Sequence, residues 1–155
     1  MAGHRYLFLL FCLFGFSHLS GQMVVGADTL IGNEWITYGQ KYFEFTIDID
    51  GVYRIPQSTL TSAGVSSSAT GSEIRIYSLG QQVPLYVSTD GVLGANDFIE
   101  FYGFKNKSEL DWHLLRHPDT DLLHPGHGMY RDQRVYYLTT EGDEQPLRVN
   151  TRVND

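Results

Sequence analysis

The pattern of hydrophobic and polar positions along the chain predicts mostly β-structure. Residues 42–48 (YFEFTID) alternate apolar and polar side chains, which is typical of a strand with one buried face. Asp50 and Gly51 follow as a two-residue turn, and residues 52–55 (VYRI) continue the apolar pattern up to Pro56. Because this arrangement is the usual signal for two adjacent antiparallel strands, we expect a β-hairpin here, ended by the proline.

Further strands are predicted at regular intervals, with turn residues between them. A short helical turn at residues 58–63 is expected to stop at Gly64, Gly80–Gln81 is expected to turn the chain, Pro84 suggests an edge strand and Gly103 suggests a bulge. The predicted strands are residues 73–78 (EIRIYS), 83–87 (VPLYV), 98–104 (FIEFYGF), 134–140 (RVYYLTT) and 147–153 (LRVNTRV). We therefore expect an all-β, antiparallel two-sheet, sandwich-like domain with one or two short helices and a long loop.

The long loop is the stretch from Lys105 to Gln133, which shows no period-two pattern. Loops of this length inside a compact domain tend to be functional or mobile. Residues 108–115 are expected to form a short helix with Ser108 as its N-cap, with Leu110, Leu114 and Leu115 facing inward and Pro118 ending it.

The N-terminus predicts export. Residues 6–16 (YLFLLFCLFGF) carry no charge, follow Arg5 and precede a run of small and polar residues, which is the order of a secretory signal peptide. The run is shorter than the ~20 apolar residues that a stable membrane span needs. We expect residues 1–21 to be a signal peptide, 22–32 an N-terminal lead and 33–155 a β-rich domain. The expected location is the periplasm, the outer-membrane surface or the extracellular space.

Composition excludes several functions. Without the signal peptide and its Arg5, 10 basic and 18 acidic side chains remain, a net charge of −8, which disfavours nucleic acid as a partner. The one cysteine of the chain, Cys12, also lies in the signal peptide. The mature chain is therefore expected to have no catalytic thiol, no cysteine-bound zinc and no disulfide, and neither a nucleotide-binding loop nor a GxSxG element occurs in it.

Two polar segments could bind metal. All four histidines of the mature chain, His113, His117, His124 and His127, lie in the long loop. Such a loop is most often solvated, and metal binding and a response to pH remain the alternatives. Calcium is a further alternative at Asp90–Gly91 and Asn96–Asp97, although turn formation explains the same residues. We expect no cofactor and assign no metal site; the four histidines are kept as candidate metal ligands.

Aromatic residues are abundant and allow two interpretations. They would act either as core fillers or as a platform on which a sugar or a peptide stacks. The aromatic residues in question are Trp35, Tyr38, Tyr53, Tyr86, Tyr102, Tyr136 and Tyr137.

Four segments, in order, resemble a known family. They are IDIDGVYRIP (residues 47–56), IRIYSLGQQVPLYV (74–87), DFIEFYG (97–103) and YRDQRVYYLTT (130–140). Together they are similar to the N-terminal β-rich domain of gingipain-type cysteine peptidases, the PorU-like sortases of the type IX secretion system of Bacteroidota. The resemblance covers roughly residues 33–140.

The resemblance implies a non-catalytic role for this chain. In that family the catalytic cysteine and histidine lie in a later domain, and no residue of this chain matches them. The expected function is therefore that of a secreted domain, incomplete at its C-terminal end, which packs against or shields a peptidase domain or another type IX secretion component. The alternative is a stand-alone cell-surface adhesion or ligand-binding β-sandwich, with the long loop as its binding element.

Overall fold

The computed structural model describes residues 23–25, 28–30, 33–108, 111–124 and 126–149. The chain divides into two compact units, Met1–Glu34 and Trp35–Asp155. In the first unit, β1 (Met23–Val25) pairs antiparallel with β2 (Asp28–Leu30). The expected signal peptide lies outside the described residues. In the part of the chain that is described, no helix has the length and apolar character needed to cross a membrane.

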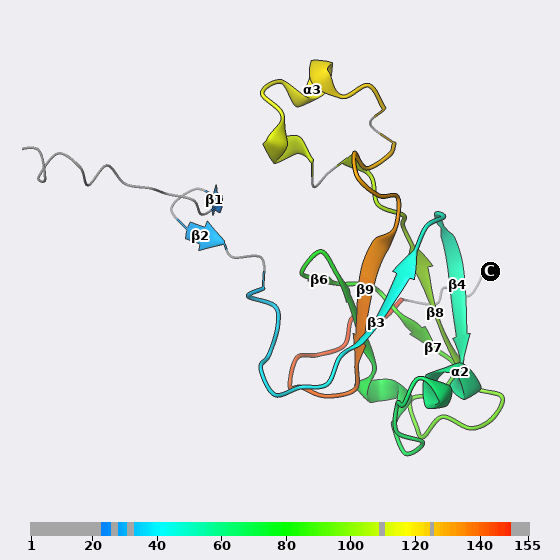
Figure 1. The fold of residues 1–155 in the computed structure, drawn as a ribbon. Coiled ribbons are helices and arrows are strands. Elements are labelled where there is room, and N and C mark those ends of the chain that lie inside the picture. The colour runs from blue at the N-terminus through cyan, green and yellow to red at the C-terminus, as the bar shows by residue number, and fades with distance from the viewer. Residues whose placement is uncertain (1–22, 26–27, 31–32, 109–110, 125, 150–155) are drawn as a thin grey trace, which may run out of the picture. The chain divides into compact units, whose positions relative to one another are not determined.

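The second unit consists of two antiparallel sheets, which confirms the predicted fold class (Figure 1). The four-stranded sheet has the order β3 (Phe43–Ile47), β9 (Arg134–Thr139), β5 (Arg75–Ser78) and β6 (Gln81–Gln82). The three-stranded sheet has the order β4 (Gly51–Pro56), β8 (Phe98–Gly103) and β7 (Tyr86–Val87). The helical elements that lie wholly within the described residues are short: α2 (Gln57–Ser62), α3 (Pro118–Asp121) and two 3-10 turns, Gly71–Glu73 and Trp112–Leu114.

The hydrophobic core lies between the two sheets. Alternate residues of each strand face it, as the period of two predicts. Phe101 of β8 meets Phe45 of β3 and Tyr136 of β9, with ring centroids 5.9 Å and 5.6 Å away. The most deeply buried side chains of the core are Ile74, Ile76, Leu85, Ile99, Phe101, Tyr136 and Leu138.

Strand β5 is buried on both faces. Its inner face joins the core, whereas its outer face is covered by Trp35 and by the chain after β9. Trp35 stacks on Tyr77 at 5.4 Å. Arg75 is only 7% exposed, and its guanidinium donates hydrogen bonds to the main-chain oxygens of Glu144 and Gly142. The buried arginine thus finds acceptors in main-chain carbonyl groups, as buried polar groups generally do.

The predicted hairpin at Asp50–Gly51 is wrong. β3 pairs with β9, and β4 pairs with β8, so the three residues between β3 and β4 carry the chain from one sheet to the other. The Asp50 carboxylate fixes this crossing because it accepts a hydrogen bond from the Lys105 amide at 2.7 Å and pairs with Lys107 at 3.0 Å. Alternation defines the faces of a strand, but it does not identify the partner.

The predicted bulge at Gly103 is also wrong. The register of β4 with β8 runs without interruption to Gly51 opposite Gly103. The glycine is required by packing instead: a Cβ at this position would meet Cδ1 of Ile47 and approach the Tyr53 ring to 3.0 Å.

The strand predicted at residues 83–87 is shorter in the structure, where only Tyr86 and Val87 of this segment form a strand, β7. β6 ends at Gln82 in one sheet, and β7 begins at Tyr86 in the other. Both are edge strands, as Pro84 suggested, and the proline lies where the chain changes sheets. The preceding turn is Leu79–Gly80 rather than Gly80–Gln81, because Ser78 pairs with Gln81.

Two further predictions are corrected. Within residues 147–149 the structure has a single parallel bridge, Leu85 to Arg148, in place of a strand, and the remainder of the predicted strand lies outside the described residues. In the long loop, Leu114 is 65% exposed instead of facing inward. Pro118 begins α3 rather than ending a helix, since the first helical position needs no N–H donor.

Candidate functional site

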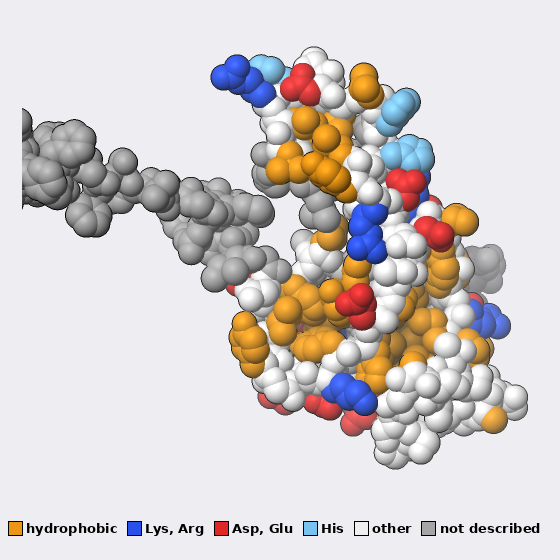
Figure 2. All heavy atoms as spheres, in the orientation of Figure 1, with side chains coloured by type: hydrophobic (Ala, Val, Ile, Leu, Met, Phe, Trp, Pro, Cys, Tyr) orange, Lys and Arg blue, Asp and Glu red, His pale blue; other side chains and the backbone are white. Residues whose placement is uncertain are grey.

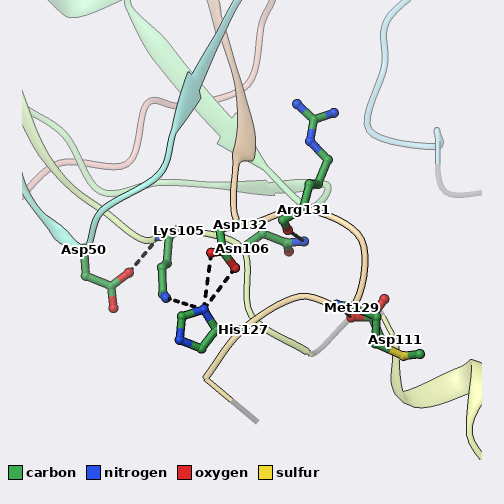
Figure 3. A network of polar contacts seen from close by, with 8 residues as sticks. All are labelled: Asp50, Lys105, Asn106, Asp111, His127, Met129, Arg131 and Asp132. Carbon is green, nitrogen blue, oxygen red and sulfur yellow. Dashed lines mark hydrogen bonds and ion pairs between the residues drawn. The ribbon is translucent and has the colours of Figure 1, made fainter. Parts of the chain in front are cut away.

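The long loop leaves the end of β8 and returns at the start of β9, and a polar network joins its two ends (Figure 3). The Asn106 amide donates to the Asp132 carbonyl at 2.7 Å, and the Asn106 side chain donates to the Arg131 carbonyl at 2.9 Å. His127 Nδ1 lies 3.2 Å from both Asp132 carboxylate oxygens and 3.2 Å from Lys105 Nζ. The loop is therefore an excursion with a fixed base, and we call residues 105–133 the excursion.

The structure places His124 and His127, two of the four histidines that the sequence singled out, along one small hollow. His127 belongs to the base, whereas His117 is exposed and its amide donates to the Asp121 carboxylate at 3.0 Å. His124 is exposed, and the side chain of His113 lies outside the description. Among the described residues, no three or more side chains of the metal-ligating types come together.

Asp111 has a role in the excursion that sequence reasoning missed. It is only 7% exposed, and its carboxylate accepts a hydrogen bond from the Met129 amide at 2.8 Å (Figure 3). It thereby joins the two halves of the excursion. The sequence held no signal for this contact, because the two residues are 18 positions apart.

The Asp97 carboxylate, which the calcium alternative used, is occupied by the protein. One oxygen accepts from the Ser88 hydroxyl and the other from the Gly94 amide, both at 2.7 Å. These two hydrogen bonds, the hydroxyl first, lower the pKa of Asp97 because they stabilise its charged form. The arrangement supports the turn-forming interpretation of this residue.

Most of the aromatic residues pack inside the fold. Tyr53 and Tyr136 belong to the aromatic core, and Trp35 covers Tyr137 on the outer face of the four-stranded sheet. Tyr38 and Tyr102 are exceptions, at 84% and 48% exposed, and the Tyr102 ring lies 4.8 Å from that of Phe104, which is 44% exposed. The Tyr102–Phe104 pair borders an apolar hollow of the second unit.

The hollow is an apolar groove of about 450 Å³, beside the points where the excursion leaves and returns. Its size lies within the ~300–1,000 Å³ typical of ligand sites. The Tyr136 hydroxyl closes its floor by accepting from the Phe104 amide at 2.8 Å and donating to the Phe104 carbonyl at 2.9 Å. We call it the β8 groove; it is lined by Ser78, Leu79, Gln81, Gln82, Val83, Pro84, Tyr102, Phe104, Arg134, Tyr136 and Val149.

Leu79 at the rim of the β8 groove has an unfavourable backbone. Its φ of 50° and the φ of 78° at Gly80 form a two-residue hairpin turn with positive φ at both central residues. Asparagine or glycine normally occupies such positions, and a branched side chain there costs about 1 kcal/mol. Leu79 is nevertheless 47% exposed to solvent and lines the groove, so the unfavourable backbone conformation lies at the groove rim.

Exposed apolar side chains also gather on the excursion, where Figure 2 shows a hydrophobic group. A smaller hollow of about 280 Å³ lies there, lined in part by Leu122, Leu123 and His124. Among its described residues, the large apolar side chains that the excursion exposes are Trp112, Leu114, Leu123, Met129 and Tyr130.

The sequence pointed to the excursion and missed the β8 groove. Two signals could have indicated it: a proline inside a predicted strand, at Pro84, and a leucine before glycine in a tight turn, at Leu79. Comparison with known proteins gives no match to a protein family, to a curated protein or to a solved structure.

Proposed function

We propose that this chain is a secreted, non-catalytic β-domain that packs against a cysteine-peptidase domain of the gingipain or PorU-like type. The observation that carries the proposal is the β8 groove with its exposed apolar rim. Leu79, Tyr102, Phe104 and Val149 each leave 44–48% of their surface in water around one hollow. Clustered apolar exposure of this kind marks interaction surfaces, whereas isolated exposed side chains do not.

The sequence supports the assignment of the partner. The ordered segments quoted above are the ground for a peptidase of this family, and the location of Cys12 in the expected signal peptide leaves the mature chain without a thiol nucleophile. A domain that contributes a binding surface but no catalytic residue fits both facts.

Binding and cleavage test this proposal together. The mature chain is titrated into a PorU-like peptidase domain by isothermal calorimetry, and the chain alone is assayed on arginine, lysine and sortase-type peptide substrates. We expect a 1:1 complex and no cleavage by the chain alone. Cleavage by the chain alone, or no complex at 100 µM, roughly the weak limit of specific protein pairs, would contradict the proposal.

The exposed side chains of the excursion favour one second candidate, a stand-alone adhesion or ligand-binding β-sandwich. Replacing residues 107–131 by a short glycine–serine linker tests it. The replacement leaves the hydrogen bond from the Asn106 amide to the Asp132 carbonyl in place. On this second hypothesis, binding to a glycan or peptide array is lost with the excursion; on the first, binding to the peptidase domain survives.

A further inference from the structure

In the part of the chain that the structure describes, the β8 groove lies beside a strand position of the three-stranded sheet that is left unfilled. β7 pairs with only two residues of β8, Tyr86 opposite Glu100 and Val87 opposite Ile99. Continuing this register places Pro84 opposite Tyr102. Pro84 has no N–H to donate, and the chain leaves for the other sheet at this point. Among the described residues, the strand partner of Tyr102 is Val52 of β4, on the opposite side.

The main-chain groups of Tyr102 point toward this unfilled position. The Ser88 amide donates to the Phe98 carbonyl at 3.1 Å, so the N–H and C=O of Phe98 face the β7 side. In an antiparallel pair these groups alternate in direction along the strand. Glu100 and Tyr102 therefore direct theirs to the same side, and those of Tyr102 open toward the β8 groove.

The charge at the groove selects the occupant further. Arg134 is the single ionisable cation among the residues that line it. Lys107 Nζ, which pairs with Asp50, lies 5.2 Å from the centroid of the Phe104 ring on the groove border. Apolar walls that include a positive charge complement an apolar segment that carries a carboxylate.

We infer that the β8 groove binds an extended acidic–apolar segment of the partner by strand addition. The segment pairs with the N–H and C=O of Tyr102, places an apolar side chain against Leu79 and Phe104, and directs a carboxylate toward Arg134. Main-chain hydrogen bonds supply affinity in this mode, and side-chain pockets supply specificity. The inference rests on the proposed function only in taking the chain for a binding domain.

A set of fluorescent heptapeptides tests the inference by polarisation with the mature chain. The peptides alternate threonine and valine, with aspartate beside a central valine, leucine or phenylalanine; matched peptides carry asparagine for aspartate. Two more carry N-methyl groups on one or the other alternate set of residues. In strand addition only one of these sets faces β8, so one N-methylated peptide should lose binding and the other should keep it.

Leu79→Asn is the matched protein variant, since asparagine accepts the positive φ and the fold is retained. We expect this variant to bind the aspartate peptide more weakly by about tenfold or more, because the apolar contact is lost. The asparagine peptide should bind the wild type about fivefold more weakly. Leu123→Asn, which changes an 88% exposed leucine of the excursion, should leave binding unchanged.

The outcomes separate this inference from the proposed function. Absence of peptide binding at 1 mM, equal binding by Leu79→Asn, or equal losses from both N-methylated peptides would overturn the inference. If, in addition, the peptidase domain binds the wild type and Leu79→Asn equally well, the proposed function stands and only the strand-addition inference is refuted. Peptide binding with the expected pattern, but no complex with the peptidase domain, would leave the inference standing and refute the assigned partner.

Discussion

The Tyr136→Phe substitution removes a single oxygen atom, the hydroxyl oxygen at the floor of the β8 groove. Tyr136 is 1% exposed, and its hydroxyl makes two hydrogen bonds with the main chain of Phe104, at 2.8 Å and 2.9 Å. The substitution keeps the ring in the aromatic core and removes the hydrogen-bond partner of both the N–H and the C=O of Phe104. Phe104 directly follows β8, so these bonds hold the groove floor and the start of the excursion.

The magnitude follows from the number of bonds. Each hydrogen bond of this kind contributes about 1 kcal/mol net, so the free energy of unfolding should fall by about 2 kcal/mol. For a unit of this size, that corresponds to a fall of roughly 8 °C in Tm. Urea denaturation and calorimetry measure the two quantities, and amide exchange at Phe104 should become faster than in the wild type.

Tyr130→Phe is the matched control, because Tyr130 is 82% exposed. Its effect should stay within about 0.5 kcal/mol, as for most surface substitutions. If Tyr136→Phe falls within the same limit, the hydroxyl does not hold the end of β8, and our description of the groove floor is wrong.

Three other changes test the packing and the electrostatics of the fold. Burial first, and then the hydrogen bond to Glu144 at 2.6 Å, raise the pKa of Tyr77. The neutral Tyr77 side chain therefore stabilises the folded state below its ordinary pKa near 10, and this stabilisation is lost at higher pH. The free energy of unfolding, measured in urea at pH 8–11, should depend less on pH in Tyr77→Phe. Hydrogen bonds from the Thr70 amide and then its side chain lower the pKa of Glu73. The ionised Glu73 carboxylate therefore stabilises the folded state above its ordinary pKa near 4.3, and this stabilisation is lost as the pH falls. Acid unfolding that is unchanged in Glu73→Gln would contradict this. Gly71→Ala should destabilise the fold by about 2 kcal/mol or more in urea titrations, because its Cβ would meet the Thr89 carbonyl, whereas Gly126→Ala, with open space around its Cβ, should not.

Hydrophobic alternation predicted the strands because one face of each sheet is buried. It did so well for β3, β8 and β9, whose inner residues alternate as expected. It failed for the partner of each strand, since pairing of β3 with β9 joins residues about 90 positions apart and leaves no local signal. The sequence showed that Pro84 has no N–H to donate to a neighbouring strand. It did not show that this leaves an open strand position beside Tyr102, because that depends on where β8 lies in the fold.

The candidate site was predicted less well than the fold. The histidines attracted attention because they are clustered along the chain, yet only His127 has a described side-chain partner, and that partner set belongs to the base of the excursion. The β8 groove draws on residues from Ser78 to Val149, which no spacing rule connects. Leu79 was visible in the sequence only as an unusual residue before a turn glycine.

Amide hydrogen exchange at Tyr102 tests the central claim most directly. Its N–H is directed into the β8 groove in the free chain, so it should exchange quickly there. In complex with the PorU-like peptidase domain, we expect its exchange to slow by tenfold or more, as for an amide paired in a strand. If the complex forms and the Tyr102 amide exchanges as in the free chain, then the partner binds elsewhere, and the assignment of the β8 groove is wrong.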